Sequence, residues 1–183
     1  MNFEWPVGAK KDCQSVTRDW DSVNRKLISG VLLKEVRNVP GNSGMLTEVF
    51  RQDWFAERIA VDQVFQVRFQ PGTVSAWHAH AFTTDRLFVN SGMMLIVLYD
   101  GRRGSSTFGL INEFRCGLYR PSLAVIPPQV WHGVANTSCN TASLLNLVDQ
   151  AYRYDDPDNW RLPQDTPEIP YRFPMSIGGD ALL

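Results

Sequence analysis

Short β-patterned segments follow one another along most of this 183-residue chain, with Gly, Pro, Asn and Ser turns between them. In the stretch from Asp62 to Gly72, DQVFQVRFQPG, apolar and polar residues alternate as they do in a half-buried strand. Further strands are expected over residues 28–39, 45–54, 93–100, 106–111, 122–127, 132–138 and 142–148. No helical pattern separates these strands, which argues against a parallel α/β sheet and predicts an all-β sandwich or barrel of the jelly-roll kind.

The two ends of the chain differ in composition from the β-rich middle. Residues 1–27 are expected to form an N-terminal extension, with a short helix over residues 19–27. Residues 28–150 are expected to form the β-barrel. Residues 151–183 are rich in proline and aromatic side chains, which favours an irregular tail packed on the barrel. The sequence therefore predicts one domain over residues 1–183.

The charge balance argues against several classes of partner. Lys and Arg number 18 and Asp and Glu number 19, so the sequence predicts neither a nucleic-acid surface nor a polybasic membrane patch. The first residues lack the apolar run of a signal peptide, and no apolar run approaches the roughly 18 residues of a membrane span. The cysteines lack CxxC spacing, which favours reduced thiols in a cytoplasmic protein.

Only three histidines occur in the chain, and they fall in two β-patterned blocks. His78 and His80 stand at i and i+2, so in a strand their side chains share one face. His132 reaches the same cavity only if the sheet folds back on itself. A lone histidine is more often a surface or satisfied core residue, but the two blocks together predict a shared site. Trp77 and Trp131 each precede a site histidine and are expected to pack in the core.

The spacing of residues in these two blocks resembles the cupin pattern. With Asp in place of Glu, the first cupin motif is matched by Gly72, His78, His80, Asp85 and Gly92. The second motif keeps Pro127, His132 and Asn136 but has Pro121 and Gln129 in place of glycines. The resemblance implies a double-stranded β-helix, the cupin jelly-roll barrel, flanked by the N-terminal extension and the Pro-rich C-terminal tail.

Other stretches carry a second resemblance, which runs from about Val31 to Phe173. They are EVFRQDW at 48–54, GTVSAWH at 72–78, DGRRGSSTFG at 100–109, IPPQVWHGV at 126–134 and DDPDNW at 155–160. In these stretches the chain is similar to the dTDP-4-dehydrorhamnose 3,5-epimerase family, which are cupins that act on nucleotide-linked keto-sugars. The resemblance implies a homodimeric epimerase of carbohydrate biosynthesis that binds a nucleotide sugar and needs no cofactor.

The family pattern assigns catalytic roles to individual residues. It places the base at His78 and a second histidine at His132, and it matches the family lysine approximately to Arg86. Arg86 is therefore expected to supply a positive charge beside the developing enolate. The family aspartate that pairs with the base has its counterpart in Asp180.

The chain also departs from the family pattern. Ser75 replaces an arginine that usually contacts phosphate, and Asn146 falls at the position of the catalytic tyrosine. Asparagine donates a hydrogen bond but cannot return a proton to carbon. A tail tyrosine, either Tyr152 or Tyr154, is the expected replacement.

The same residues also suit a metal ion. Three imidazoles and one carboxylate form a first shell for Fe, Mn, Ni, Zn or Co, and the predicted ligands are His78, His80, Asp85 and His132. His80 stands where the family has glutamine, which favours this alternative. The alternatives to a metal-free epimerase are therefore a metal-dependent isomerase or dioxygenase, and a cupin that binds a small ligand without chemistry.

Overall fold

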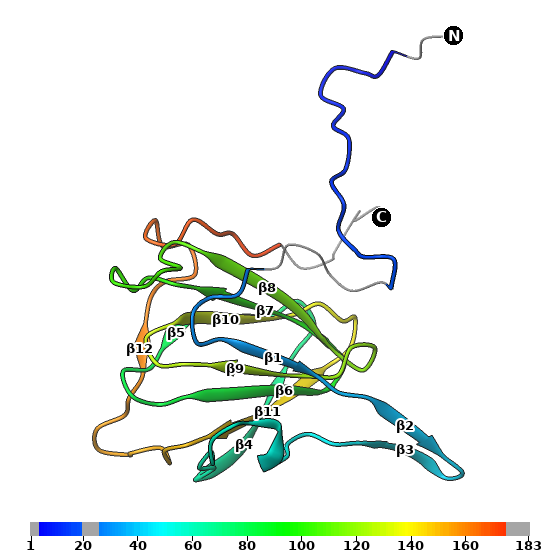
Figure 1. Ribbon diagram of the computed structural model, residues 1–183. Coiled ribbons are helices and arrows are strands. Elements are labelled where there is room, and N and C mark those ends of the chain that lie inside the picture. The colour runs from blue at the N-terminus through cyan, green and yellow to red at the C-terminus, as the bar shows by residue number, and fades with distance from the viewer. Residues whose placement is uncertain (1–3, 20–25, 175–183) are drawn as a thin grey trace.

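The computed structural model describes residues 4–19 and 26–174, and it shows two antiparallel sheets packed face to face (Figure 1). The first sheet contains, in spatial order, β1 (Leu32–Glu35), β9 (Ser122–Ile126), β6 (Asp85–Ser91), β11 (Ala142–Val148) and β4 (Gln63–Phe69). The second sheet contains β12 (Trp160–Arg161), β5 (Val74–Ala79), β10 (Trp131–Asn136), β7 (Met93–Tyr99) and β8 (Ile111–Gly117). The all-β prediction is confirmed.

A hairpin and one helical turn complete the described elements. β2 (Asn38–Gly41) pairs only with β3 (Gly44–Thr47), and this hairpin extends from the barrel in Figure 1. A 3₁₀ turn, η1 (Gln52–Trp54), follows it. Within residues 4–19 and 26–174, no helix is long and apolar enough to cross a membrane. The short helix expected over residues 19–27 falls mostly on residues 20–25, which lie outside the described residues.

The strand β7, which lies between β10 and β8, is buried on both faces, and its alternating side chains build two clusters. Met94, Ile96 and Leu98 join the main core between the two sheets. Leu95 and Val97 point the other way, into a second cluster that holds residues of the tail. Because both faces are covered, β7 reads in the sequence as a continuous apolar run instead of an alternating one.

The second cluster is centred on Trp77, which is fully buried. Its ring lies 6.1 Å from the ring of Tyr171 and 5.2 Å from that of Phe173, measured between centroids. Trp131 is partly buried against the same cluster. The core prediction for both tryptophans is confirmed, and the alternation of β5 leaves the neighbouring His78 facing the other side of the strand.

The single strand predicted over residues 28–39 splits into β1 and β2, with residues 36 and 37 in neither. Two further strand predictions are wrong. Over residues 45–54, β3 ends at Thr47 and η1 begins at Gln52, because Arg51 bonds to Asp53 and Glu48 and closes a turn. Over residues 106–111, only Ile111 lies in a strand, and residues 106–110 form a loop. The rest of β8 (Ile111–Gly117) was missed, although it alternates between buried and exposed positions.

The loop before β8 is closed by the carboxylate of Asp100, which is fully buried. This carboxylate accepts hydrogen bonds from Ser105 Oγ and Thr107 Oγ1, each at 2.6 Å, and from Arg102 Nε at 2.7 Å. Burial alone would raise the pKa of Asp100, but these donors hold it well below its usual range. The DGRRGSSTFG stretch is therefore a structural loop, in which Arg102 is already paired with Asp100.

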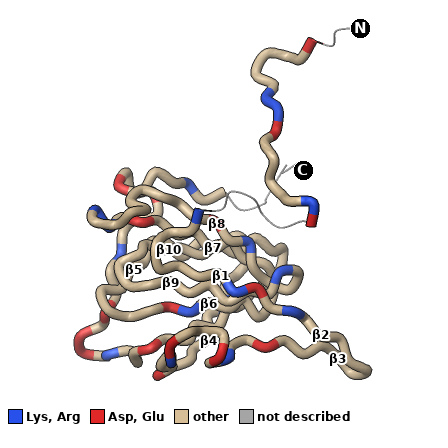
Figure 2. The backbone as a smooth tube through the Cα atoms, viewed as in Figure 1, with Lys and Arg blue, Asp and Glu red and all other residues tan. Residues whose placement is uncertain are grey.

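Basic and acidic side chains are mixed along the described chain (Figure 2). Residues 4–19 are largely exposed and lie away from the barrel in Figure 1. The charges that matter for a ligand are therefore those around one local cavity and not those of the molecule as a whole.

Candidate active site

A cavity of about 390 Å³ opens among the strands that carry the three histidines. The first sheet contributes residues of β4, β6 and β11 to its wall, and the second contributes residues of β5 and β10. The segment from Gln150 to Arg161 covers the rest. The wall includes His78, His80, Asp85, His132, Asn146, Tyr152, Arg153 and Arg161.

The structure brings the three histidines together in this cavity. His78 on β5 lies directly opposite His132 on β10 in the strand register, and their ring centroids are 6.0 Å apart. The centroids of His80 and His132 are 5.4 Å apart. The i, i+2 spacing in the sequence and the antiparallel pairing of the two blocks produce this arrangement.

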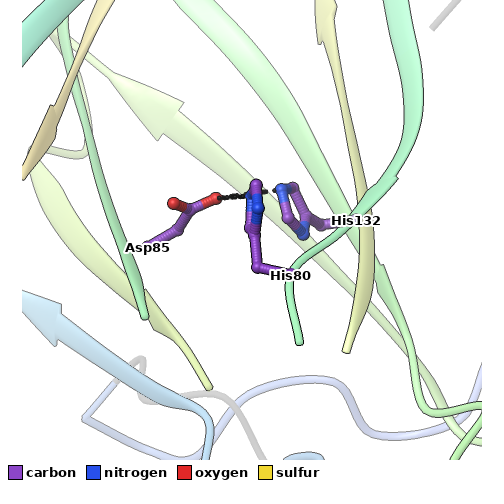
Figure 3. A group of neighbouring side chains, drawn as sticks. All are labelled: His80, Asp85 and His132. Atoms are coloured by element: carbon purple, nitrogen blue, oxygen red, sulfur yellow. Dashed lines mark hydrogen bonds and ion pairs between the residues drawn. The ribbon is translucent and has the colours of Figure 1, made fainter. Parts of the chain in front are cut away.

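Asp85 joins two of the histidines (Figure 3). Its Oδ2 lies 3.1 Å from His80 Nε2 and 3.0 Å from His132 Nε2, and its Oδ1 accepts a 2.9 Å hydrogen bond from Asn146 Nδ2. The carboxylate is almost fully buried, which by itself would raise its pKa. The hydrogen bonds from His132 and His80 outweigh burial, so the pKa of Asp85 lies well below its usual range and the group is ionised.

The outer nitrogens of these two rings contact backbone carbonyls. His80 Nδ1 lies within hydrogen-bonding distance of the Asp158 carbonyl, and His132 Nδ1 lies 3.2 Å from the Val130 carbonyl. A carbonyl oxygen can only accept, so both Nδ1 atoms carry a proton. Burial lowers the pKa of His80, but Asp85 and then Asp158 raise it more, so the net shift is upward.

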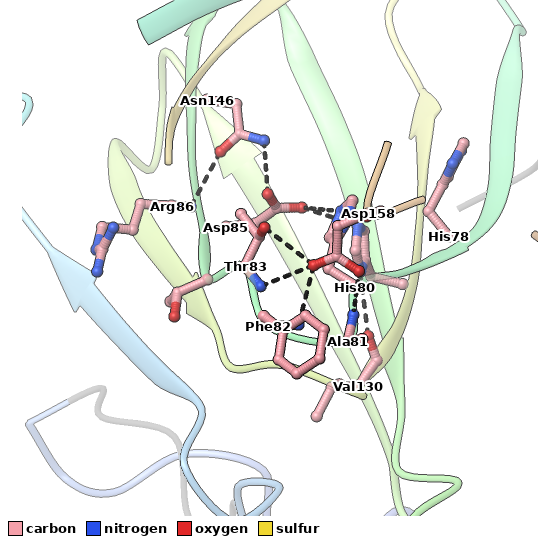
Figure 4. A network of polar contacts seen from close by, with 12 residues as sticks. His78, His80, Ala81, Phe82, Thr83, Asp85, Arg86, Val130, Asn146 and Asp158 are labelled. Atoms are coloured by element: carbon pink, nitrogen blue, oxygen red, sulfur yellow. Dashed lines mark hydrogen bonds and ion pairs between the residues drawn. The ribbon is translucent and has the colours of Figure 1, made fainter. Parts of the chain in front are cut away.

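His78 differs from the other two histidines (Figure 4). Its Nε2 lies 2.9 Å from Ser75 Oγ, and it is not one of the three residues whose donor atoms lie within 4.8 Å of one another, namely His80, Asp85 and His132. Burial lowers the pKa of His78 to about 4, helped by the nearby positive charges of His132 and Arg161. The predicted four-ligand set is therefore reduced to three in this geometry, and the His78 ring is neutral near pH 7.

Arg86 does not face the cavity, although it was expected beside the enolate. It follows Asp85 on β6, so the two side chains leave the strand on opposite faces, as Figure 4 shows. Its guanidinium donates to the carbonyls of Ala60 and Leu147, and it lies 3.7 Å from Asp149. This position does not fit the expected catalytic role.

Asn146 and the tail tyrosines are placed clearly. Asn146 is buried and bridges Asp85 to the backbone N–H of Arg86, so its side chain holds the site together. Tyr152 lines the cavity, whereas Tyr154 is 89% exposed and is not among the lining residues. Asp180 lies outside the described residues.

Two residues of the tail were missed by the sequence analysis. The Asp158 carboxylate accepts hydrogen bonds from the backbone N–H groups of Ala81, Phe82 and Thr83, as well as from Thr83 Oγ1 (Figure 4). Arg161 on β12 lies directly opposite His78 on β5. The sequence analysis matched the DDPDNW stretch to the family but gave it no role in the site, and no local pattern shows which distant strand a tail will join.

Comparison with known proteins places this arrangement in a family. The sequence model of the dTDP-4-dehydrorhamnose 3,5-epimerase family matches residues 25–177. The chain belongs to this family. The family prediction and the jelly-roll prediction are both confirmed. A dTDP sugar isomerase from Desulfovibrio desulfuricans G20 has the same fold, with 32% identity and a TM-score of 0.73 over 79% of this chain and 90% of the isomerase.

Two further proteins that are similar in sequence to this chain have names that refer to glycan or polysaccharide biosynthesis. The probable low-salt glycan biosynthesis epimerase Agl13 of Haloferax volcanii is 34% identical over 135 residues, which are 72% of this chain and 86% of Agl13. The spore coat polysaccharide biosynthesis protein SpsL of Bacillus subtilis is 28% identical over 149 residues, which are 80% of this chain and 97% of SpsL.

The contacts of Asp158 predict a loss of stability when its charge is removed. Asp158→Asn replaces one acceptor oxygen with an N–H₂ group that faces backbone donors, so the free energy of unfolding should fall by about 1–3 kcal/mol. Urea denaturation measures this change. The matched control is Asp155→Asn at an exposed position, which should stay within about 0.5 kcal/mol of the natural protein. Equal losses in the two variants would contradict the role given to Asp158.

Proposed function

We propose that this protein epimerises a nucleotide-linked keto-sugar, with His78 as the base that removes a proton from the carbon next to the carbonyl. The proposal is carried by the position of His78, a half-buried neutral imidazole on the cavity wall of a chain in the dTDP-4-dehydrorhamnose 3,5-epimerase family. Proteins of the same fold support the substrate class, since ChmJ from Streptomyces bikiniensis is known in complex with dTDP-quinovose.

His78 has the chemistry that proton abstraction requires. Its low pKa keeps the ring unprotonated near pH 7, and Ser75 Oγ fixes the direction of the ring. As the C–H bond breaks, its electron pair moves toward the carbonyl oxygen and the proton passes to His78. The enolate that forms is an anion beside the ring, so it raises the proton affinity of His78 during the step.

Inversion also requires an acid on the opposite side of the substrate. Asn146 cannot supply this proton, and its amide is already bonded to Asp85. Tyr152 is a cavity-lining phenol carried by the tail, and it is 47% exposed at the cavity mouth. We assign the acid role to Tyr152, which would take over from the tyrosine missing at position 146.

The mouth of the cavity suits a nucleotide. Arg161 and Arg153 both line it, and Arg153 pairs with Asp156 at 3.2 Å. The charge of Arg161 is close enough to lower the pKa of His78, so a phosphate bound to Arg161 would lie beside the base. Phe65 and Tyr152 add partly exposed aromatic faces on which a base can stack. We assign Arg161 to the phosphate contact that Ser75 leaves open.

A metal-dependent isomerase or dioxygenase is the second candidate function. One observation favours it, which is that the donor atoms of His80, Asp85 and His132 lie within 4.8 Å of one another. Membership of the epimerase family favours proton transfer without a cofactor. A cupin that only binds a small ligand is the third alternative, and it differs from both because it would catalyse no reaction.

A homodimer is part of the proposal. The hairpin of β2 and β3 exposes Val39, Met45 and Leu46 by 55%, 60% and 63%, and β1 forms an edge of the first sheet. Exposed apolar side chains and a strand edge are both surfaces that a second copy can cover.

The base assignment predicts the behaviour of His78→Asn. This variant should exchange the proton next to the carbonyl of dTDP-4-keto-L-rhamnose for solvent deuterium at least about 10²-fold more slowly, because the positioned base is gone. Mass spectrometry of the sugar measures exchange. Tyr152→Phe should keep exchange but slow inversion of the carbon centre. Gln164→Asn, at an exposed position, is the control and should change neither rate. Undiminished exchange in His78→Asn, with an intact fold by circular dichroism, would rule out this base.

The phosphate assignment predicts weaker nucleotide binding in Arg161→Gln. Loss of a charge-assisted contact costs about 1.5–3 kcal/mol, so the Kd for dTDP should rise about tenfold or more. Isothermal titration calorimetry measures this without any turnover. Arg103→Gln is the matched control, since Arg103 is an exposed arginine that does not line the cavity. A similar Kd in both variants would remove Arg161 from the site.

The dimer proposal predicts a mass in solution of twice the 20.8 kDa chain. Light scattering after size exclusion measures it. The double substitution Met45→Lys and Leu46→Lys places charges on the exposed hairpin and should shift the protein toward the monomer if the hairpin lies in the interface. A monomeric natural protein at micromolar concentration would refute the dimer.

A further inference from the structure

His80, Asp85 and His132 gather three electron-pair donors at one point of the cavity wall. Each imidazole has a proton on Nδ1, because that atom faces a backbone carbonyl. Each Nε2 also meets the same carboxylate oxygen, Asp85 Oδ2, at 3.1 and 3.0 Å, and donates a hydrogen bond to it. A metal ion bound at this point would take the place of these two Nε2 protons, because metal ligands must be deprotonated.

We propose that this cluster binds one divalent first-row transition metal ion through His80 Nε2, Asp85 Oδ2 and His132 Nε2. Imidazole nitrogen with carboxylate oxygen is the donor set that Fe, Mn, Co, Ni and Zn accept. In a metal site with bonds of about 2.1 Å, neighbouring ligand atoms at right angles are about 3.0 Å apart. The Nε2–Oδ2 separations of 3.0 and 3.1 Å match this ligand spacing.

The atoms around the cluster are arranged as they are around bound metals. Ligating histidines generally donate the other ring N–H to a carbonyl or carboxylate, which fixes the tautomer. Here the carbonyls of Asp158 and Val130 do this, and Asn146 Nδ2 occupies the second oxygen of Asp85. The tail contributes to this outer layer, because the Asp158 carboxylate anchors the turn that follows His80.

His78 stays outside the metal shell. Its Nε2 is engaged by Ser75 Oγ, and it is absent from the group of donors that lie within 4.8 Å. Since all three ligands line the cavity, the remaining coordination positions of the ion face the substrate space. The ion would polarise the carbonyl oxygen there, a charge that Arg86 does not supply because it lies on the other face of β6. This catalytic role rests on the proposed function, whereas binding of the ion does not.

The test measures metal binding without substrate. Tag-free protein, grown with metals supplied and purified without chelator, should contain close to one equivalent of a transition metal by elemental analysis. After removal of the metal, titration with Co(II) should give one site by calorimetry and a visible absorption band. Less than about a tenth of an equivalent in the first experiment, with no Co(II) binding in the second, would overturn the proposal.

Variants separate the proposed three-ligand set from the four-ligand alternative. His80→Gln, Asp85→Asn and His132→Asn should each weaken Co(II) binding more than about 100-fold, since even outer-layer changes cost 10–100-fold. His78→Asn is the matched control and should bind Co(II) as the natural protein does. Equal loss in His78→Asn would refute the three-ligand set. If a ligand variant unfolds, the melting temperature is measured instead. Co(II) should then raise the Tm of the natural protein and of the His78→Asn variant by the same amount, and no rise in His78→Asn would refute the three-ligand set.

The outcomes also separate this inference from the proposed function. Metal binding that survives in His78→Asn while deuterium exchange is lost supports both. Metal binding in a natural protein that shows no exchange supports the metal site alone. Exchange by a protein that binds no Co(II) keeps the epimerase proposal and overturns the metal site.

Discussion

The buried carboxylate of Asp85 is the constraint on which the site depends. It belongs to the first sheet, whereas His132 belongs to the second and His80 directly follows β5 of the second, so its contacts join the two sheets. Asn146, on a neighbouring strand of the first sheet, occupies the remaining oxygen. A buried charge costs several kcal/mol unless it is fully paired. The same contacts that form the site therefore fix how the two sheets lie against each other around it.

Regular strands made most of the fold predictable from the sequence. Alternation placed His78 and His80 on one face and Trp77 on the other, and antiparallel pairing then brought His132 opposite His78. The same rule, applied to β6, would have turned Arg86 away once Asp85 was assigned to the cavity. The family pattern instead matched Arg86 to a lysine by an approximate alignment. An error of one residue in such an alignment moves a side chain to the opposite face of a strand.

Long-range contacts set the limit of prediction. The loop after Asp100 has residues with strand propensity, but the buried carboxylate binds Ser105 and Thr107 and bends the chain instead. The roles of Asp158 and Arg161 depend on where the tail returns to β5, which no local pattern encodes. The different pKa shifts of His78 and His80 could not be predicted either, since the two residues look alike in the sequence and differ only in their neighbours in the fold.

The anchoring of His80 by Asp158 has a consequence for how the protein matures. The two residues are 78 positions apart, so a growing chain contains all three histidines well before the carbonyl that orients His80 has left the ribosome. The barrel strands up to β11 can pair first, while the turn after His80 keeps unsatisfied N–H groups. Competence of the site is therefore delayed until the tail docks.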